Sequence, residues 1–184
     1  DEKEAEQWLA TIEPSQRDKA RQAWKLYREA RTLLKGCGSE TLARGVTAFY
    51  ESNSDGDDLV IGEKLLPTLR NQKPDDGAPA LSLADFVMPA TEGRPDIIGV
   101  FAVSARIPES RSERSDPLVA QTLSARLAEA SAEWLHRKSY RGIRPAVGYP
   151  SLPDQLLNLN IADLLPLADI GIEMTENGAM DPSS

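Results

Sequence analysis

Residues 141–150, Arg-Gly-Ile-Arg-Pro-Ala-Val-Gly-Tyr-Pro, combine residue types that suit the binding of a small molecule. Two prolines fix φ at their own positions and push the preceding residues, Arg144 and Tyr149, toward extended backbone. Gly142 and Gly148 allow backbone conformations, or a close approach of a ligand, that a Cβ would block. We therefore expect a rigid, non-helical turn that holds a guanidinium and a phenol in set directions. Such a turn suits an anionic molecule with a flat or apolar part.

The same composition is also typical of an ordinary Pro/Gly loop whose arginine caps a helix or meets water, and composition alone favours that interpretation. A second candidate is Glu129, which lies among small residues of an expected helix. It is either a solvated glutamate or a carboxylate directed into a site. His136, near the end of that helix, is expected to interact with the helix C-terminus rather than with a ligand.

Composition narrows the function classes. The chain has 184 residues, a net charge of −8, one Cys and one His. The charge argues against nucleic acid or an anionic membrane surface as the main partner. One Cys rules out an intrachain disulfide framework, and one Cys with one His argues against a transition-metal site. No apolar run approaches the length of a membrane span, and no signal region follows the charged N-terminus, so we expect a cytoplasmic protein.

The first part of the chain reads as helical over residues 4–34, with an interruption at Pro14 and with Ser15 as the N-cap of the second helix. That helix has one apolar face, which we expect to form core: Ala20, Ala23, Trp24, Tyr27, Ala30, Leu33 and Leu34. The sequence Gly36-Cys37-Gly38 should end it.

The middle of the chain predicts strands over residues 44–50 and 97–105, the second one buried. Gly99 suggests that a neighbour packs closely on that strand. The acidic loop 53–58 fails a calcium-loop test, because the required glutamate would fall at Gly62, so a hairpin between residues 47–50 and 59–61 is the better account. Residues 65–71 are interpreted as a short helix or the end of one.

The last part predicts a long helix over residues 118–137, a helix over 156–170 that ends at Gly171, and a short strand over 172–175. One side of the long helix is expected to be lined by Leu118, Thr122, Ala125, Ala128 or Glu129, Ala132 and Leu135. We expect a single domain over 1–184, with a helical part at about 4–35 and an α+β body at about 42–180.

With these elements in place, residues 141–150 resemble the S-adenosylmethionine-binding motif of the activation domain of cobalamin-dependent methionine synthase. Further segments resemble parts of that family in the same order: residues 44–46, 55–58, 81–87, 98–103, 126–130 with 135–136, and 174–180. The similarity runs from about Trp8 to Met180. One such segment alone is a weak signal, whereas six in order are a strong one.

The resemblance implies an α+β fold, an antiparallel β-sheet with flanking helices. It implies that the chain binds S-adenosylmethionine and supports reductive methylation of a cobalamin carried by a partner domain or subunit, because the chain has no Asp-x-His-x-x-Gly motif of its own. A flavodoxin-like protein would supply the electron. Methyl transfer from a sulfonium needs placement and orientation rather than a general acid or base, so no catalytic side chain is expected.

The resemblance also implies roles for individual residues. Arg144 would pair with the ligand carboxylate, since a guanidinium can make a bidentate, charge-assisted contact, and Glu129 would accept from the ammonium. Backbone near Ala146 and Gly148 would contact the adenine, and Tyr149 would pack beside it. The implied binding residues are Arg144, Pro145, Ala146, Gly148, Tyr149 and Glu129.

Three parts of the family pattern have no counterpart: an Asp-Trp or Asn-Trp segment at the start, a long connection between His136 and Arg141, and a Val-Ser-Gly strand with a tyrosine after Met180. Either residues are missing from the sequence at these points or the protein is truly shortened and binds the ligand poorly. We favour the first, because three residues do not easily reverse a helix into a Pro-rich motif. The alternative functions are a degenerate docking module for a corrinoid protein or reductase, and an unrelated enzyme that binds another carboxylate at Arg144.

Overall fold

The computed structural model describes residues 2–38, 40, 42–72, 74, 76–113 and 115–182. The chain divides into two compact units. Unit 1 comprises Asp1–Leu42 and Ala105–Leu127, and unit 2 comprises Ala43–Ser104 and Ala128–Ser184. Strand β4 and helix α4 each contribute to both units.

Unit 1 is helical and contains α1 (Glu2–Ala10), η1 (Pro14–Gln16), α2 (Arg17–Gly36), α3 (Glu109–Ser112) and the first half of α4 (Pro117–Ser139). Its core joins Leu33, Cys37, Ile107 and Ala120. The predicted break at Pro14 and the helix end at Gly36 are confirmed. The predicted cap at Ser15 is wrong: Ser15 lies inside η1, and Gln16 precedes α2 without a side-chain capping bond.

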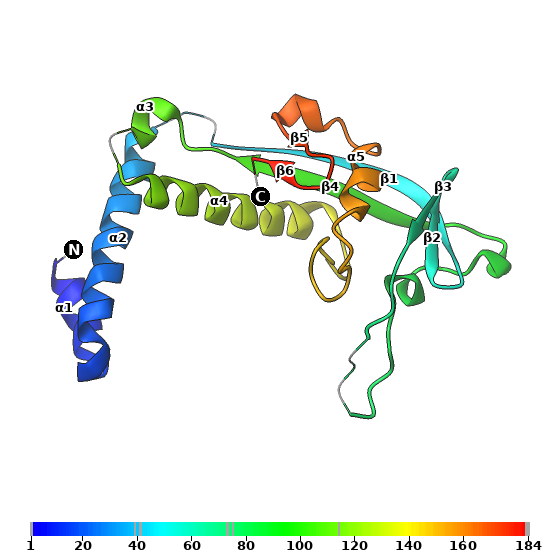
Figure 1. Ribbon diagram of the computed structural model, residues 1–184, viewed down its shortest axis with the longest axis horizontal. Helices are drawn as coiled ribbons and strands as arrows, with labels where there is room; N and C mark the ends of the chain where they lie inside the picture. Colours follow the sequence, from blue (N-terminus) through cyan, green and yellow to red (C-terminus); the bar gives the residue numbers. More distant parts are fainter. Residues whose placement is uncertain are drawn as a thin grey trace. The chain divides into compact units, whose positions relative to one another are not determined.

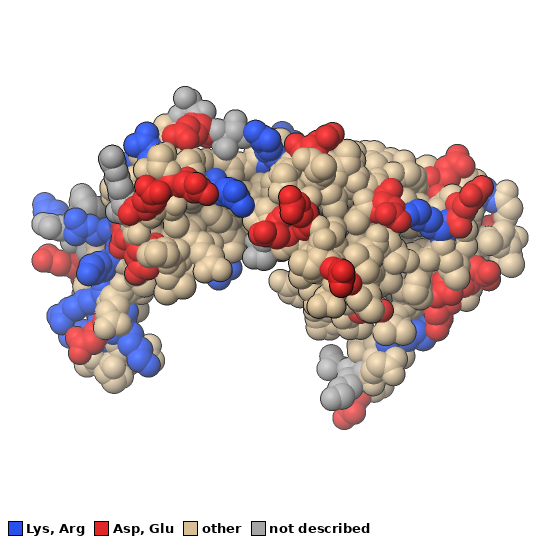
Figure 2. All heavy atoms as spheres, turned by 45° about the horizontal axis from the view of Figure 1, so that its top comes forward, with Lys and Arg blue, Asp and Glu red and all other residues tan. Residues whose placement is uncertain are grey.

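The apolar face of α2 is mostly exposed, which corrects the expectation that it forms core. Of its seven residues only Ala20 and Leu33 are buried. Trp24 is half-buried between the rings of Trp8 and Tyr27, with centroid separations of 6.0 and 5.3 Å. The helix also carries seven Lys or Arg against two acidic residues, so basic side chains gather over this part of an acidic chain (Figure 2).

Unit 2 is built on a four-stranded antiparallel sheet in the order β3-β2-β1-β4 (Figure 1). The strands are β1 (Ala43–Asp55), β2 (Asp58–Ile61), β3 (Lys64–Pro67) and β4 (Asp96–Ala105). Pairing of Asp55 with Asp58 leaves Gly56 and Asp57 as a two-residue turn, in which Gly56 has φ +61. A glycine at the first position of such a turn matches the twist of a hairpin.

This pairing confirms the expected hairpin, although the partner of β2 is the segment 52–55 rather than 47–50. A second two-residue turn joins Ile61 to Lys64. The interpretation of residues 65–71 as helical is therefore wrong. Residues Lys64–Pro67 form β3, because their backbone pairs with β2.

The two faces of the sheet carry different layers. On one face, Val46, Ala48, Val100 and Ala102 pack against the cluster of Leu165, Leu167, Ile170 and Ile172. The opposite face, with Gly45, Gly99 and Val103, lies under Leu135 of α4 and under Tyr140. This alternation follows from the two-residue period of side chains along a strand.

The remaining elements of unit 2 are short: η2 (Leu83–Phe86), η3 (Ala90–Glu92), α5 (Leu157–Ala162), η4 (Leu167–Ile170), β5 (Glu173–Met174) and β6 (Met180–Asp181). The single helix expected over 156–170 is interrupted before Pro166, the residue that precedes η4. Gly171, with φ +71, ends η4 as expected, and the predicted strand at 172–175 is present as β5.

Strand β4 and helix α4 are present as predicted, but the residues that they bury differ from those expected. Strand β4 is buried only at Val103, Ser104 and Ala105, whereas Ile97 is 59% exposed. Helix α4 buries Val119, Ala120 and Ala128, while Leu118, which was expected on the inner side, is exposed. No helix among the described residues is long and apolar enough to cross a bilayer.

Candidate ligand-binding site

The segment 141–150 is non-helical, as its composition predicts, and both of its glycines have positive φ. Gly142 has φ +99 and Gly148 has φ +86, conformations that side-chain-bearing residues rarely adopt. The Gly148 N–H donates to the Leu152 carbonyl at 2.8 Å, and the Leu152 N–H donates to the Tyr149 carbonyl at 2.8 Å. These bonds close a tight turn after Arg144.

Tyr140 anchors the start of the segment to the sheet. Its ring packs against Phe49 and Phe101, with centroid separations of 5.0 and 5.3 Å. Its hydroxyl hydrogen-bonds to Thr47 Oγ1 and donates to the Val100 carbonyl at 3.2 Å. A Cβ on Gly99 would overlap the Tyr140 ring, with Cζ at 2.8 Å. The close neighbour that the sequence predicted at Gly99 is therefore Tyr140.

The end of the segment is anchored separately. Leu152 is buried in a cluster with Leu59, Ile61 and Leu157, and Val147 packs against the same cluster. Tyr50, whose hydroxyl donates to the Leu164 carbonyl at 2.6 Å, contacts the cluster from the sheet. Arg144 thus lies between two hydrophobic anchors, which limits how far its backbone can move.

Arg144 pairs with carboxylates of α4. Its Nη2 donates to Glu129 Oε1 at 2.8 Å and lies 3.5 Å from Glu133 Oε2. The Arg144 side chain is 23% exposed and that of Glu129 is 59% exposed. The two residues to which the resemblance assigns opposite charges of one ligand are therefore adjacent, and in the free chain they neutralise each other.

Glu133 is a neighbour that the sequence analysis did not name. Arg137 donates from Nε to Glu133 Oε1 at 2.6 Å. This hydrogen bond is the main cause that holds the pKa of Glu133 below its usual range, and the charge of Arg144 acts in the same direction, while burial opposes both. The signal was present in the sequence, because residues four apart on a helix lie on one face and Glu133 follows Glu129 at that spacing.

The structure distributes the other implied binding residues around this pair. Tyr149 is 62% exposed, and Pro145 and Ala146 are half-buried. The Ala146 carbonyl already accepts from the Tyr149 N–H at 3.3 Å, so the turn uses part of the backbone expected to contact an adenine. Among the described residues, no hydrogen bond uses the Gly148 carbonyl, and a Cβ at Gly148 would meet open space.

His136 lies in the last turn of α4, as expected, but its main contact is aromatic. Its ring stacks on Tyr140 with a centroid separation of 6.2 Å. Its buried Nε2 has no hydrogen-bond partner among the described residues. His136 therefore packs against Tyr140, and it lies one turn after Glu133 on the same side of α4.

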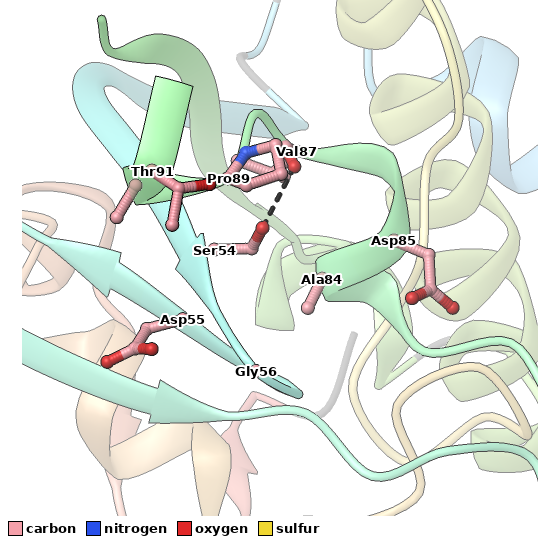
Figure 3. Close-up of a pocket in the computed structure, with 9 residues that line it drawn as sticks. Ser54, Asp55, Gly56, Ala84, Asp85, Val87, Pro89 and Thr91 are labelled. Atoms are coloured by element: carbon pink, nitrogen blue, oxygen red, sulfur yellow. Dashed lines mark hydrogen bonds between the residues drawn. The ribbon is translucent and has the colours of Figure 1, made fainter. Parts of the chain in front are cut away.

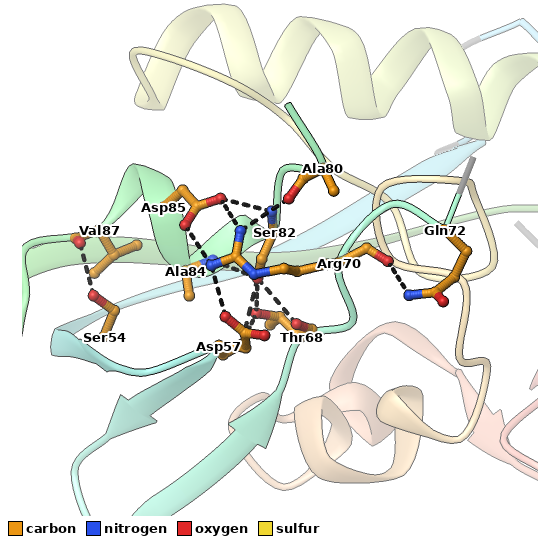
Figure 4. A network of polar contacts seen from close by, with 10 residues as sticks. All are labelled: Ser54, Asp57, Thr68, Arg70, Gln72, Ala80, Ser82, Ala84, Asp85 and Val87. Carbon is orange, nitrogen blue, oxygen red and sulfur yellow. Dashed lines mark hydrogen bonds and ion pairs between the residues drawn. The ribbon is translucent and has the colours of Figure 1, made fainter. Parts of the chain in front are cut away.

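A second arginine cluster lies at the hairpin end of the sheet (Figure 4). Arg70 donates to both Asp85 oxygens at 2.8 and 2.9 Å and to the Ala80 carbonyl at 2.9 Å, and its Nη2 lies 2.6 Å from Asp57 Oδ1. The Asp85 carboxylate also accepts from the Ser82 N–H at 2.8 Å. The bond from Arg70 is the main cause that lowers the pKa of Asp85, and the Ser82 N–H adds to it.

A hollow of about 370 Å³ adjoins this cluster (Figure 3). It is lined by Ser54, Asp55, Gly56, Ala84, Asp85, Val87, Pro89, Ala90 and Thr91. None of the six residues implied for ligand binding lines it. The Ser54 hydroxyl donates to the Val87 carbonyl at 3.0 Å and Asp85 is held by Arg70, so two of its polar groups already serve the fold.

The structure joins α4 directly to the Arg144 segment. The helix continues to Ser139, and the Tyr140 N–H donates to the His136 carbonyl at 2.9 Å. Met180 and Asp181 likewise belong to one continuous strand, β6.

Comparisons with known proteins bear on this arrangement. A family described as "Vitamin B12 dependent methionine synthase, activation domain" matches residues 6–139 and 135–184. The two stretches overlap over residues 135–139, at the end of α4, where the family's long connection has no counterpart in the sequence. A solved structure, described as the crystal structure of the MetH reactivation domain bound to AdoHcy, is similar with a TM-score of 0.75 and 28% identity. The similarity covers 95% of this chain and 68% of that one.

These matches confirm the α+β fold and the resemblance stated from the sequence. The family match spans nearly all of the chain, and the fold agrees with that of the solved structure. The chain belongs to the family of activation domains of vitamin B12-dependent methionine synthase.

Proposed function

We propose that this chain binds S-adenosylmethionine beside Arg144 and supports reductive methylation of the cobalamin cofactor of methionine synthase. The observation that carries the proposal is that Arg144, on a segment anchored at both ends, lies with its Nη2 2.8 Å from Oε1 of Glu129 on α4. The related reactivation domain is described as bound to AdoHcy, which has the same carboxylate, ammonium and adenosine groups.

The residues present fit such a ligand. A guanidinium and a carboxylate side by side match the carboxylate and ammonium of an α-amino acid head group. Gly148 leaves open space on the side where a Cβ would stand, so a flat group can approach the backbone there. Tyr149, which is exposed next to it, offers an aromatic surface for an adenine.

In this proposal the role of the chain is to position the bound ligand. S-adenosylmethionine, when bound, supplies the methyl group. Arg144 would hold its carboxylate and Glu129 its ammonium, so that the sulfonium is presented in one orientation to the partner that carries the cobalamin. Orientation of this kind can lower a barrier substantially without any acid or base. A flavodoxin-like protein is proposed as the source of the electron.

The alternative is a docking module with the same fold and no ligand. The observation that favours it is the direct connection between Ser139 and the Arg144 segment, at the point where the two family matches overlap. Residues that complete the site in relatives would be absent from this region.

Calorimetric titration with S-adenosylmethionine separates the two functions. We expect saturable binding by a chain whose circular dichroism shows it to be folded, and transfer of a labelled methyl group to a reduced, cobalamin-loaded partner domain. No binding by a folded chain would favour the docking module. The matched control is Arg144→Lys. It keeps the positive charge but loses the planar guanidinium that can bind a carboxylate through two donors, so it separates the effect of charge from that of geometry.

A further inference from the structure

Helix α2 of unit 1 carries a row of basic side chains that is interrupted by one tryptophan. Positions spaced by alternating steps of four and three residues share one side of a helix, and six such positions run along α2. They are Arg17, Arg21, Trp24, Arg28, Arg31 and Lys35, and this set is named the arginine stripe. Every arginine of α2 belongs to it, and all of its members except Trp24 are exposed. None of the six residues implied for ligand binding belongs to it.

The fold already uses the first half of the arginine stripe. Arg17 donates from Nε at 3.2 Å to a backbone carbonyl of the segment between α1 and α2, and Arg21 pairs with Asp18 at 3.3 Å. Trp24 receives the ring of Trp8, which α1 brings to a centroid separation of 6.0 Å. Helix α1 has three glutamates and one lysine in nine residues. The first half of the stripe therefore holds an acidic helix that is anchored by an aromatic ring.

The second half of the arginine stripe is open. The side chains of Arg28, Arg31 and Lys35 are exposed and have no ion-pair or hydrogen-bond partner among the described residues. The glutamate of this half, Glu29, is engaged on another side of the helix, where its Oε1 accepts from the Asp116 N–H at 2.9 Å. Like charges at this spacing on a helix repel one another. A partner that places carboxylates along the row would remove this repulsion.

An exposed aromatic surface adjoins the open half. Tyr27 is 53% exposed, and its ring continues that of Trp24 at a centroid separation of 5.3 Å. Arginine, tryptophan and tyrosine are the residue types that contribute most binding energy at protein interfaces. We propose that Tyr27 and the open half of the arginine stripe dock an acidic amphipathic helix of a partner protein.

Charge complementarity selects this occupant. Helix α2 has seven basic against two acidic residues, whereas the whole chain has a net charge of −8. A long polyanion such as a nucleic acid is repelled by the net negative charge of the rest of the chain, whereas a single helix can be confined to the stripe. A second copy of α2 would bring the same positive charge. The acidic helix α1, already seated on the first half, gives the mode of docking, one helix alongside another.

The test measures the binding of a fluorescein-labelled synthetic helix to the full chain by fluorescence polarisation. The probe has the length of α2, 20 residues, with glutamates and one tryptophan along one face and with alanine and glutamine elsewhere. A reference peptide has the same composition, but its glutamates are spread around the helix. We expect saturable binding of the probe that weakens as salt rises, and weaker binding of the reference peptide. No binding of the probe, or equal binding of the two peptides, overturns the proposal.

Charge-matched variants locate the surface. Arg28→Gln/Arg31→Gln removes two charges from the stripe and should weaken probe binding by about 5–30-fold, the upper range for two ion pairs at a surface. Lys19→Gln/Lys25→Gln removes two charges from other sides of the same helix and should change the affinity by less than about twofold. Equal losses in the two double variants would mean that the probe senses only the charge of unit 1, and the proposal would fail.

Tyr27→Ala separates a fitted surface from charge attraction. It alters no charge, and it should weaken the probe in a chain whose circular dichroism shows it to be folded, because an aromatic contact is lost. A single-stranded oligonucleotide of mixed sequence serves as the competing polyanion. We expect it to bind more weakly than the probe at the same salt concentration, and tighter binding of the oligonucleotide would overturn the assignment of the stripe to a protein helix.

Discussion

Arg70 and Arg144 are both arginines of unit 2 that meet two carboxylates, yet they are built differently. Arg70 makes a two-pronged contact with Asp85, a close contact with Asp57 and a hydrogen bond to a backbone carbonyl. Among the described residues, Arg144 makes one side-chain hydrogen bond, to an exposed glutamate. The fold therefore occupies the Arg70 guanidinium with three partners, whereas most donors of Arg144 have no partner in the part of the chain that the structure describes.

The partners of the two arginines differ in the same way. Asp85 also accepts from the Ser82 N–H and completes a capping box at η2, so a second contact of the fold holds this carboxylate beside Arg70. Glu129 has no second ion-pair partner among the described residues. An arginine–carboxylate pair is therefore structural or exchangeable according to what else holds the carboxylate.

The largest expected effects, on ligand affinity and on thermal stability, come from replacing each of the two arginines by alanine in separate variants. Arg144→Ala should weaken S-adenosylmethionine binding by about 10–100-fold, because it deletes a charge-assisted contact. Its thermal midpoint should stay near that of the wild type, since the carboxylate left behind, Glu129, is exposed and such a single ion pair contributes little to stability. Arg70→Ala should lower the thermal midpoint and leave the affinity of the folded chain unchanged. Calorimetry for binding and circular dichroism for unfolding check both, and equal behaviour of the two variants would contradict the comparison.

Gly99→Ala tests how the Arg144 segment is positioned. An added Cβ overlaps the Tyr140 ring, and overpacking of this kind costs about 1–3 kcal/mol of unfolding free energy. Because Tyr140 begins the Arg144 segment, binding should weaken as well. Denaturant unfolding and calorimetry measure the two effects. If Tyr140→Ala in the same chain does not relieve the stability loss, Tyr140 is not the group that Gly99 accommodates.

Ser82→Ala should act on the Arg70 side alone. The buried Ser82 hydroxyl caps η2 through the Ala84 N–H at 3.2 Å and lies 2.7 Å from Thr68 Oγ1. Loss of an N-cap costs about 0.5–2 kcal/mol. Urea unfolding should show this loss, while the affinity for S-adenosylmethionine stays unchanged. A weakened affinity would mean that the two clusters are coupled.

The smallest expected effect is a change in folding stability at acidic pH. Arg70 holds the pKa of Asp85 below its usual range, so the Asp85 contact stabilises the fold above about pH 4, near the ordinary value for an aspartate. That contribution is lost as pH falls through the folded-state pKa. The difference in stability between the wild type and Arg70→Gln should therefore shrink below about pH 4. Urea midpoints between pH 3 and 7 measure it, and a difference independent of pH would contradict the assignment.

Local patterns in the sequence predicted several features because their causes are local. Gly56 and Gly171 mark turns that need positive φ, and the structure has both. Gly99 predicted a close neighbour, but that neighbour, Tyr140, is distant in sequence and no local pattern identifies it. Strand β3 was missed because four residues ending in proline become a strand only through pairing with β2.

The sequence predicted the residues of the candidate site, but it did not predict that Arg144 and Glu129 pair with each other in the absence of a ligand. The residue pattern identified Arg144 and Glu129 as candidates, and the family resemblance gave their roles, in which each pairs with a ligand group rather than with the other. The apolar face of α2 shows a related limit. Periodicity predicts that one side of a helix is apolar, but it does not say how much of that side is covered, and most of this face is exposed.

A crystal structure of the chain grown with S-adenosylhomocysteine would show directly whether the ligand opens the Arg144–Glu129 pair. We expect the ligand carboxylate on the Arg144 guanidinium, its ammonium on Glu129, and the direct Arg144–Glu129 bond broken. Ligand bound elsewhere, for instance in the hollow beside Ser54 and Thr91, with the 2.8 Å pair intact, would contradict it.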